Sequence, residues 1–362
     1  MIYPTRPVMP DINEYVKYIK KIWQNRWLTN HGKFVNLLEE KLAGYLSVNN
    51  LVCVANGTLA LQLALMSYDF ERDAEIITTP FSFIATTNVI INEKLKPVFA
   101  DIDPETYNID PKEVEKKITR RTKAILATHV FGNPCELKKL KQIADKHGLK
   151  LIYDAAHAFG VEYKSRPILS FGDISILSFH ATKVYHTIEG GAVIAKNSGL
   201  FKKIKLLRDF GIESEEKFVL SGVNAKMNEF QAAMGLCNLE EINQWIKKRK
   251  NIYNRYSDGL TGEKIKFQKL ISSRHNYGYM PVCFDSKQTR DRICHKLIQA
   301  GVKPRKYFYP LITDCNHVKY FAKKSEFKNA ASVADTILCL PIYPDLEIKI
   351  VNKIISIIKA NI

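Results

Sequence analysis

From about residue 50 to residue 195, short apolar runs rich in β-branched residues alternate with longer segments in which apolar residues recur every three or four positions. This alternation is typical of a parallel or mixed β-sheet covered by helices. The strand-like runs are almost continuously hydrophobic, which indicates strands with both faces buried. Seven of them are expected to form one sheet: 51–55, 75–79, 97–100, 123–128, 150–153, 174–178 and 192–195. The sequence therefore predicts an α/β fold built on a mostly parallel, seven-stranded sheet.

Helices are expected between these strands, at 59–67, 84–92, 111–118 and 137–147. After Trp245 the pattern changes to a long charged helix, a strand at 276–284, a helix at 288–300 and a final helix at 347–359. A chain of 362 residues is long enough for one large core and a second, smaller one. We therefore expect a large domain over 1–245, with an N-terminal arm, and a smaller C-terminal α/β domain over 246–362.

The formal net charge of +17 raises the question of an anionic partner. Lysines and arginines are spread along the chain among acidic residues, and the dense run from Lys247 to Lys250 has no interleaved aromatic residues. Proteins that bind single-stranded nucleic acid combine basic residues with aromatic ones. The distribution thus favours a solvated basic surface, and we expect no nucleic-acid partner.

Two other classes of protein are disfavoured. No run of about 18 uncharged apolar residues is present, and the first 24 residues lack the order of a signal peptide, so we expect a cytoplasmic protein with no membrane partner. The seven cysteines include no CxxC pair, which favours buried, reduced thiols over a metal site or disulfides.

Polar residues follow three of the expected strands. Asn56-Gly57-Thr58 follows the first, Asp154 ends the fifth, and the sixth runs into a segment from Ser178 through Lys183 to a glycine pair. In open parallel sheets, ligands bind where strands end and helices begin. Taken singly, each of these residues is ordinary, because a Gly-Thr or an Asp at a strand end is usually a helix cap and a lysine usually lies on the surface. Together they predict one site.

Asp154 and Lys183 have the chemistry that pyridoxal 5′-phosphate requires. A lysine forms an imine with an aldehyde only as the neutral amine, which a partly buried position favours. The ring nitrogen of the cofactor needs an acidic partner, because the protonated ring is the electron sink. A carboxylate and an amine at two strand ends of one sheet supply both.

Ordered motifs along nearly the whole chain make the prediction more specific: Trp27-Leu28-Thr29, Asn56-Gly57-Thr58, Asp154-Ala155-Ala156-His157, the segment from Ser178 to Gly191, the segment from Gly222 to Met227, and Tyr307-Phe308-Tyr309-Pro310. In these motifs the chain resembles the DegT/StrS family of sugar aminotransferases. The resemblance implies the fold type I aminotransferase architecture and a homodimer with a shared active site.

The resemblance also implies roles for individual residues. Lys183 corresponds to the catalytic lysine that carries the cofactor, and Asp154 to the partner of the ring nitrogen. His157 falls near the ring hydroxyl, where many relatives have glutamine, and Phe83 matches the aromatic residue that stacks on the ring. The implied phosphate contacts are Gly57, Thr58, Ser178 and, from the neighbouring subunit, Asn224. The implied substrate contacts are Thr29, His180, Tyr307 and Tyr309.

Two positions depart from the family pattern. Lys226 replaces an arginine that usually follows Asn224 by two residues, which removes any bidentate contact made there. Ile188 occupies a position before Glu189 that is commonly glycine.

The implied reaction has two halves, with Lys183 moving the proton in each. L-Glutamate first leaves its amino group on the cofactor as pyridoxamine 5′-phosphate, and a nucleotide-linked keto-sugar then receives it. The particular residues in the motifs around Asp154 and Lys183 are similar to those of the branch that aminates C4 of a dTDP-linked 4-keto-6-deoxyglucose. That reaction is a step in amino-sugar biosynthesis for O-antigen or lipopolysaccharide.

Three alternatives remain open at this stage. A relative that aminates C3 is distinguished from the C4 branch only by the particular residues within the motifs. A sugar dehydratase of the same family is the second alternative. That branch is identified by a histidine in place of the lysine, so the presence of Lys183 disfavours it. A non-catalytic regulator or nucleic-acid binder is raised by the net charge and disfavoured by the intact cofactor residues.

Overall fold

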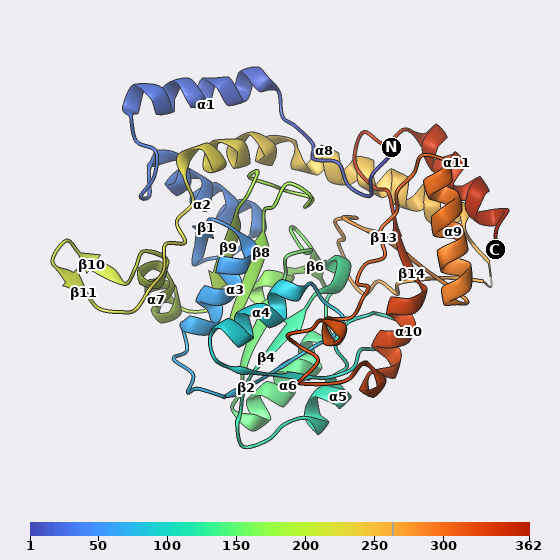
Figure 1. Ribbon diagram of the computed structural model, residues 1–362. Helices are drawn as coiled ribbons and strands as arrows, with labels where there is room; N and C mark the ends of the chain where they lie inside the picture. The colour runs from blue at the N-terminus through green and yellow to red at the C-terminus, as the bar shows by residue number, and fades with distance from the viewer. Residues whose placement is uncertain (263) are drawn as a thin grey trace.

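The computed structural model describes residues 1–262 and 264–362, and its centre is a seven-stranded sheet in the order β1-β9-β8-β5-β4-β2-β3 (Figure 1). The strands are β1 (Leu51–Val54), β2 (Glu75–Thr78), β3 (Lys96–Phe99), β4 (Thr122–Thr128), β5 (Lys150–Asp154), β8 (Ile174–Ser178) and β9 (Gly191–Ala195). Each lies within a residue or two of its predicted position, so the prediction of a mostly parallel, seven-stranded α/β sheet is confirmed.

The direction of the strands brings six carboxyl ends to one edge of the sheet. β8, β5, β4, β2 and β3 are parallel neighbours, while β9 runs antiparallel to both β8 and β1. Because β9 is reversed relative to both of its neighbours, β1 and β8 point the same way. The turns after β1, β2, β4, β5 and β8 therefore meet at the same edge.

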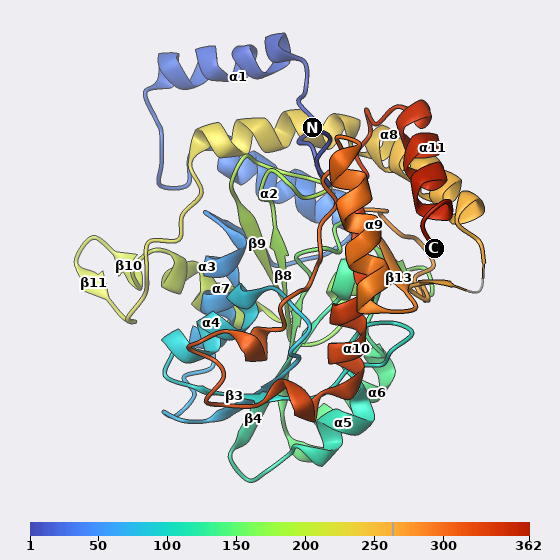
Figure 2. The ribbon, with the colours of Figure 1, turned by 45° about the vertical axis from the view of Figure 1, so that its right-hand side comes forward.

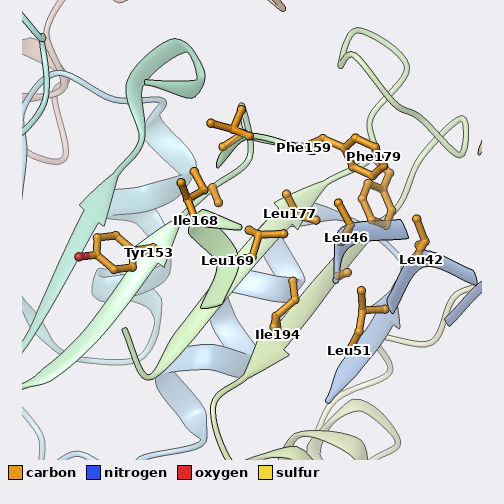
Figure 3. Packing of buried hydrophobic residues seen from close by; sticks show 14 of the residues in the cluster. Leu42, Leu46, Leu51, Tyr153, Phe159, Ile168, Leu169, Leu177, Phe179 and Ile194 are labelled. Carbon is orange, nitrogen blue, oxygen red and sulfur yellow. The ribbon is translucent and has the colours of Figure 1, made fainter. Parts of the chain in front are cut away.

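Helices cover both faces of the sheet (Figure 1). On one face, α3 (Gly57–Met66), α4 (Ile84–Asn92) and α7 (Ser198–Arg208) share a hydrophobic core with the strands. On the other lie α2 (Lys33–Leu46), α6 (Leu137–His147) and the first part of α8 (Glu229–Gly259). Figure 3 shows Leu42 and Leu46 of α2 beside Leu51, Leu177 and Ile194 from three strands of the sheet. Burial on both faces explains the continuous hydrophobic runs.

The two ends of the chain flank the long helix α8. This helix has 31 residues, and Asn228 and Gln231 form a capping box at its start. α1 (Ile12–Asn25) lies along the outer side of α8 in both ribbon views, and α11 (Ile348–Lys359) packs against its other end (Figures 1 and 2). Ile2 pairs with Val302, so the N-terminal segment crosses to the C-terminal part of the chain.

The C-terminal part contains a three-stranded antiparallel sheet, β12 (Ile265–Phe267), β13 (Met280–Phe284) and β14 (Ile337–Leu340), with α9 (Lys287–Gln299) and α10 (Lys328–Thr336). The strand expected at 276–284 begins only at Met280. Tyr277 has a positive φ of 53°, and the Asn276 side chain donates to two carbonyls of the large sheet's loops, so this stretch is a loop. α8 continues through Trp245 without a break, and the proposed division between 245 and 246 stays a prediction.

The remaining elements are short. α5 (Pro111–Lys116) packs on α6, and two hairpins pair β6 (Glu162–Tyr163) with β7 (Arg166–Pro167) and β10 (Ile212–Ser214) with β11 (Lys217–Phe218). The β10-β11 hairpin projects from the body of the molecule in Figures 1 and 2. Within the described residues, none of the helices has the length and apolar character needed to cross a membrane.

Candidate active site

A cavity of about 760 Å³ opens at the edge of the large sheet where the strand ends meet. One wall comes from the turns after β1, β2, β5 and β8, and the opposite wall from the loop that carries Arg305, Tyr307 and Phe308. Both Asp154 and Lys183 line it, as do Gly57, Thr58, Phe83, His157, Ser178 and His180. The structure thus brings together most of the side chains that the sequence singles out.

One corner of the cavity has the features of a phosphate site. The register across β1, β9 and β8 aligns Val54, Gly191 and Ser178, which places Gly57 directly beside Ser178. A Cβ atom on Gly57 would lie 2.8 Å from the Cβ of Ser178, so only glycine fits there. Asn56 caps α3 by accepting the Leu59 N–H, and the amide groups of Gly57 and Thr58 belong to the helix's first turn. Helix N-termini of this kind bind anions.

Asp154 forms the buried floor of the cavity, with 4% of its surface exposed. The Thr86 hydroxyl donates to its Oδ2 at 2.8 Å, and the Ala156 N–H donates to its Oδ1 at 3.1 Å. Burial raises the pKa of this carboxyl above its ordinary value, while the two hydrogen bonds and the positive charge of Lys183 oppose that shift. A cationic ring nitrogen placed here would favour the ionised form further.

Lys183 lies in the loop between β8 and β9. Its own N–H donates to the His180 carbonyl, and the Thr187 N–H donates to the Phe179 carbonyl, which closes the loop at both ends. The Lys183 Nζ donates to the Tyr279 hydroxyl at 3.2 Å. The amine therefore has a defined position at the wall of the cavity, beside the residue that directly precedes β13.

His157 sits among aromatic rings on the same wall as Lys183. Its Nδ1 accepts the Phe131 N–H at 3.2 Å, and its ring is parallel to that of Phe308, 5.9 Å between centroids. Burial holds the pKa of His157 well below its ordinary value, and the charges of Lys183 and Arg305 act in the same direction. The ring is thus neutral, and because Nδ1 accepts, the proton is assigned to Nε2, which can donate.

Two further residues lie at the mouth of the cavity. Phe83 is the residue before α4, lines the cavity and is 47% exposed. His180 contacts the Glu189 carboxylate at 3.5 Å and the Thr182 hydroxyl at 2.8 Å.

Three predicted contacts lie outside the lining of this cavity. Thr29 and Asn224 are exposed, and Asn224 pairs through its backbone with Asp209. The Lys226 amine contacts the Asp209 carboxylate at 2.6 Å. The ring of Tyr309 contacts several cationic side chains, with the Arg290 guanidinium 4.9 Å from its centroid. Within a single chain, these three residues do not join the others.

Comparison with known proteins settles the family. A model of the DegT/DnrJ/EryC1/StrS aminotransferase family matches residues 10–359. The chain belongs to this family. A curated relative from Shigella dysenteriae, named dTDP-4-amino-4,6-dideoxy-D-glucose transaminase, is 39% identical over 99% of this chain and 98% of its own length.

Solved structures of this family agree with the fold. The crystal structure of DesI in the presence of its TDP-sugar product has a TM-score of 0.92 at 31% identity and covers 99% of this chain and 92% of that one. The PLP form of Spr1654 from Streptococcus pneumoniae has a TM-score of 0.92 at 25% identity and covers 99% of this chain and 98% of that one. The predicted aminotransferase architecture is confirmed.

The residues present fit the cofactor on which aminotransferases of this family depend. The cavity joins an anion-binding corner at Gly57 and Ser178, a buried carboxylate at Asp154 and an amine at Lys183. These are the three chemical functions needed for the phosphate, the ring nitrogen and the aldehyde of pyridoxal phosphate. Within the described residues, no cluster of histidine, cysteine or carboxylate side chains could hold a metal, and all seven cysteines are free.

Sequence reasoning missed three residues of the site: Thr86, Tyr279 and Arg305. Thr86 lies two positions into α4, where its hydroxyl turns back toward the sheet. Tyr279 and Arg305 come from the C-terminal part, 96 and 122 residues beyond Lys183, where no strand-end pattern marks them. The Gly278-Tyr279 pair directly before an apolar strand was the one local signal available.

Proposed function

We propose that this aminotransferase transfers the amino group of L-glutamate to C4 of dTDP-4-keto-6-deoxyglucose, with pyridoxal 5′-phosphate bound to Lys183. The observation that supports it most directly is that Lys183 and the buried Asp154 line one cavity with an anion-binding corner. The name of the Shigella relative, aligned over nearly all of both chains, supports the choice of sugar. The enzyme works in the cytoplasm, and its amino sugar enters O-antigen or lipopolysaccharide.

The residues that line the cavity support an assignment of cofactor contacts. Gly57, Thr58 and Ser178 would hold the phosphate, Asp154 would hold the ring nitrogen, His157 would donate to the ring hydroxyl, and Phe83 would cover one ring face. When bound, pyridoxal phosphate supplies an electron sink that stabilises negative charge on the substrate carbon next to nitrogen.

Lys183 is the base and acid of the reaction. Its amine would take the proton from the glutamate carbon next to nitrogen in the first half-reaction and would return a proton to the sugar carbon in the second. Backbone hydrogen bonds close its loop at both ends, which holds Lys183 at the wall of the cavity.

Arg305 is the residue proposed to bind the amino donor. Of the side chains that line the cavity, only Lys183 and Arg305 are lysine or arginine. The Arg305 guanidinium lies 4.0 Å from the centroid of the Tyr307 ring, and within residues 1–262 and 264–362 it forms no ion pair. A planar guanidinium fixed against a ring and without a carboxylate partner is suited to bind a carboxylate of glutamate in a bidentate manner.

A homodimer with shared active sites accounts for the residues outside the cavity. Thr29 and Asn224 would reach the active site of the partner copy, where Asn224 would contact the phosphate. Large apolar side chains are exposed in the same region, with Trp23, Trp27 and Phe218 at 69%, 55% and 70%. Such exposure on α1, on the segment directly after it and on the β10-β11 hairpin supports a protein interface.

The test is a substrate panel. The cofactor-loaded enzyme is incubated with L-glutamate and dTDP- or UDP-linked sugars that carry the keto group at C3 or at C4, and products are identified by mass and NMR. We expect 2-oxoglutarate and a dTDP-linked sugar aminated at C4. Amination at C3, or of the UDP sugars alone, would replace the proposed substrate.

A second experiment tests the lysine itself. Borohydride reduction should trap the cofactor on Lys183, and Lys183→Ala should lose full transamination while still folding. An adduct on another lysine, or turnover at the wild-type rate in Lys183→Ala, would refute the assignment.

A further inference from the structure

The hydroxyl of Tyr279 has one hydrogen-bond partner within the described residues, and that partner is the Lys183 amine at 3.2 Å. Tyr279 is half-buried and directly precedes β13, 96 residues beyond Lys183 in the chain. Polar side-chain groups inside a protein are usually hydrogen-bonded. Here the partner is the amine proposed to move protons, and the surrounding structure holds the hydroxyl beside it.

The loop before β13 is fastened to the loops of the large sheet. The Asn276 side chain donates to the carbonyls of His157 and Phe159 at 2.9 and 3.0 Å, and its Oδ1 accepts the Gly278 N–H at 3.1 Å. A Cβ atom on Gly278 would lie 2.7 Å from a methyl of Val184, the neighbour of Lys183. The absence of a side chain at 278 is therefore what lets this loop approach the lysine.

Aromatic contacts fix the ring of Tyr279. Its centroid lies 4.4 Å from that of His157, 5.2 Å from that of Phe131 and 5.9 Å from that of Tyr307. Rings packed in this way lose the freedom to rotate the hydroxyl away from its partner. The Tyr279 oxygen is thus held in place, and the flexible Lys183 side chain can form a hydrogen bond to it.

A phenol is suited to a partner that changes its protonation state. It accepts a hydrogen bond from a protonated amine and donates one to a neutral amine, whereas a carboxylate or a carbonyl can only accept. Burial raises the pKa of Tyr279 above its ordinary value, so the hydroxyl keeps its proton while Lys183 gains and loses its own. The same contact therefore persists through the proton shuttle.

We infer that Tyr279 is a positioning residue that holds the released Lys183 amine in place, in both its charged and its neutral form, for proton transfer to and from substrate. The inference rests on the proposed function and deepens it. It assigns to the C-terminal part of the chain a direct role in orienting the catalytic base.

The test is the substitution Tyr279→Phe, which removes the hydroxyl and keeps the ring. Tyr277→Phe is the matched control. Tyr277 precedes the same strand, but its ring packs on Tyr253 and His275 and not on the lysine. Rates are expressed per Lys183-bound cofactor trapped by borohydride, so that misfolded or empty protein is not counted. For Tyr279→Phe, kcat should fall about 10- to 100-fold with KM for glutamate and sugar changed less than about threefold.

Two readouts separate positioning from a general structural role. The kinetic isotope effect with glutamate deuterated at its reacting carbon should rise in Tyr279→Phe, because proton transfer becomes the slow step. The pH dependence of the absorbance of the lysine-cofactor adduct should also shift. Tyr277→Phe should match the wild-type enzyme in both.

A kcat within about twofold of wild type with an unchanged isotope effect would overturn the role of Tyr279. So would a variant that loses only substrate affinity. A wild-type enzyme that forms the adduct but does not transaminate would instead overturn the proposed function, so the two failures are distinguishable.

Discussion

The substitution Thr86→Val isolates one hydrogen bond beneath the cofactor site. The Thr86 hydroxyl donates to Asp154 Oδ2 at 2.8 Å and also lies 2.9 Å from the Ser82 hydroxyl. Valine removes this donor and leaves a methyl against a buried carboxylate. Ser82 keeps its contact with Thr128 at 3.0 Å, so the loss falls on Asp154.

The expected magnitude follows from the charge and burial of the acceptor. A hydrogen bond to a charged group contributes about 1.5–3 kcal/mol, and a factor of ten corresponds to about 1.4 kcal/mol. The Thr86 bond is one of the contacts that lower the pKa of Asp154 against the effect of burial, so its removal raises that pKa. A carboxyl that ionises less readily is a weaker partner for a cationic ring nitrogen. We expect kcat/KM to fall about 10- to 100-fold.

The neighbouring residue supplies the control. Thr87 is also buried, and its hydroxyl has no partner within the described part of the chain, so Thr87→Val makes the same chemical change without touching Asp154. Both variants are assayed for the dissociation constant of pyridoxal phosphate, for kcat/KM and for thermal unfolding. Equal activities in Thr86→Val and Thr87→Val would refute the reasoning that links Thr86 to the reaction through Asp154.

Three further predictions address binding and stability. Arg305→Gln should raise KM for glutamate about 10-fold or more with little change in KM for the sugar, and the reverse pattern in steady-state kinetics would assign Arg305 to the nucleotide. Gly57→Ala should weaken pyridoxal phosphate binding at least about 10-fold in a fluorescence titration, because its Cβ would meet Ser178 at 2.8 Å, and unchanged affinity would contradict the phosphate corner. Burial lowers the pKa of His129 to about 3, so the neutral folded ring gives full stability above the unfolded pKa of about 6.5, and stability is lost as pH falls from there toward 3. At pH 5 this one group should cost about 2 kcal/mol in urea unfolding relative to pH 7.5, and His129→Phe should show a smaller loss than the wild-type protein.

The sequence by itself determined the central sheet and the chemistry at its edge. Strands buried on both faces must be apolar along their whole length, so the seven strands of the large sheet could be located within a residue or two. Asp154 and Lys183 were found because a strand end is a position that a sequence reveals. Gly57 and Ser178 could be found for the same reason, because Gly57 follows β1 and Ser178 ends β8.

Only the tertiary structure decided which distant residues complete the site. The insertion of β9 between β1 and β8 sets Gly57 against Ser178, and this strand order is not encoded in any local pattern. In the sequence Thr86 is an ordinary helix residue, and only the packing of α4 on the sheet brings its hydroxyl to Asp154. Tyr279 meets Lys183 across 96 residues of chain, because Asn276 and Gly278 bring their loop against the large sheet. Local periodicity reports which face of an element is buried, whereas the partner on that face is chosen by packing over the whole chain.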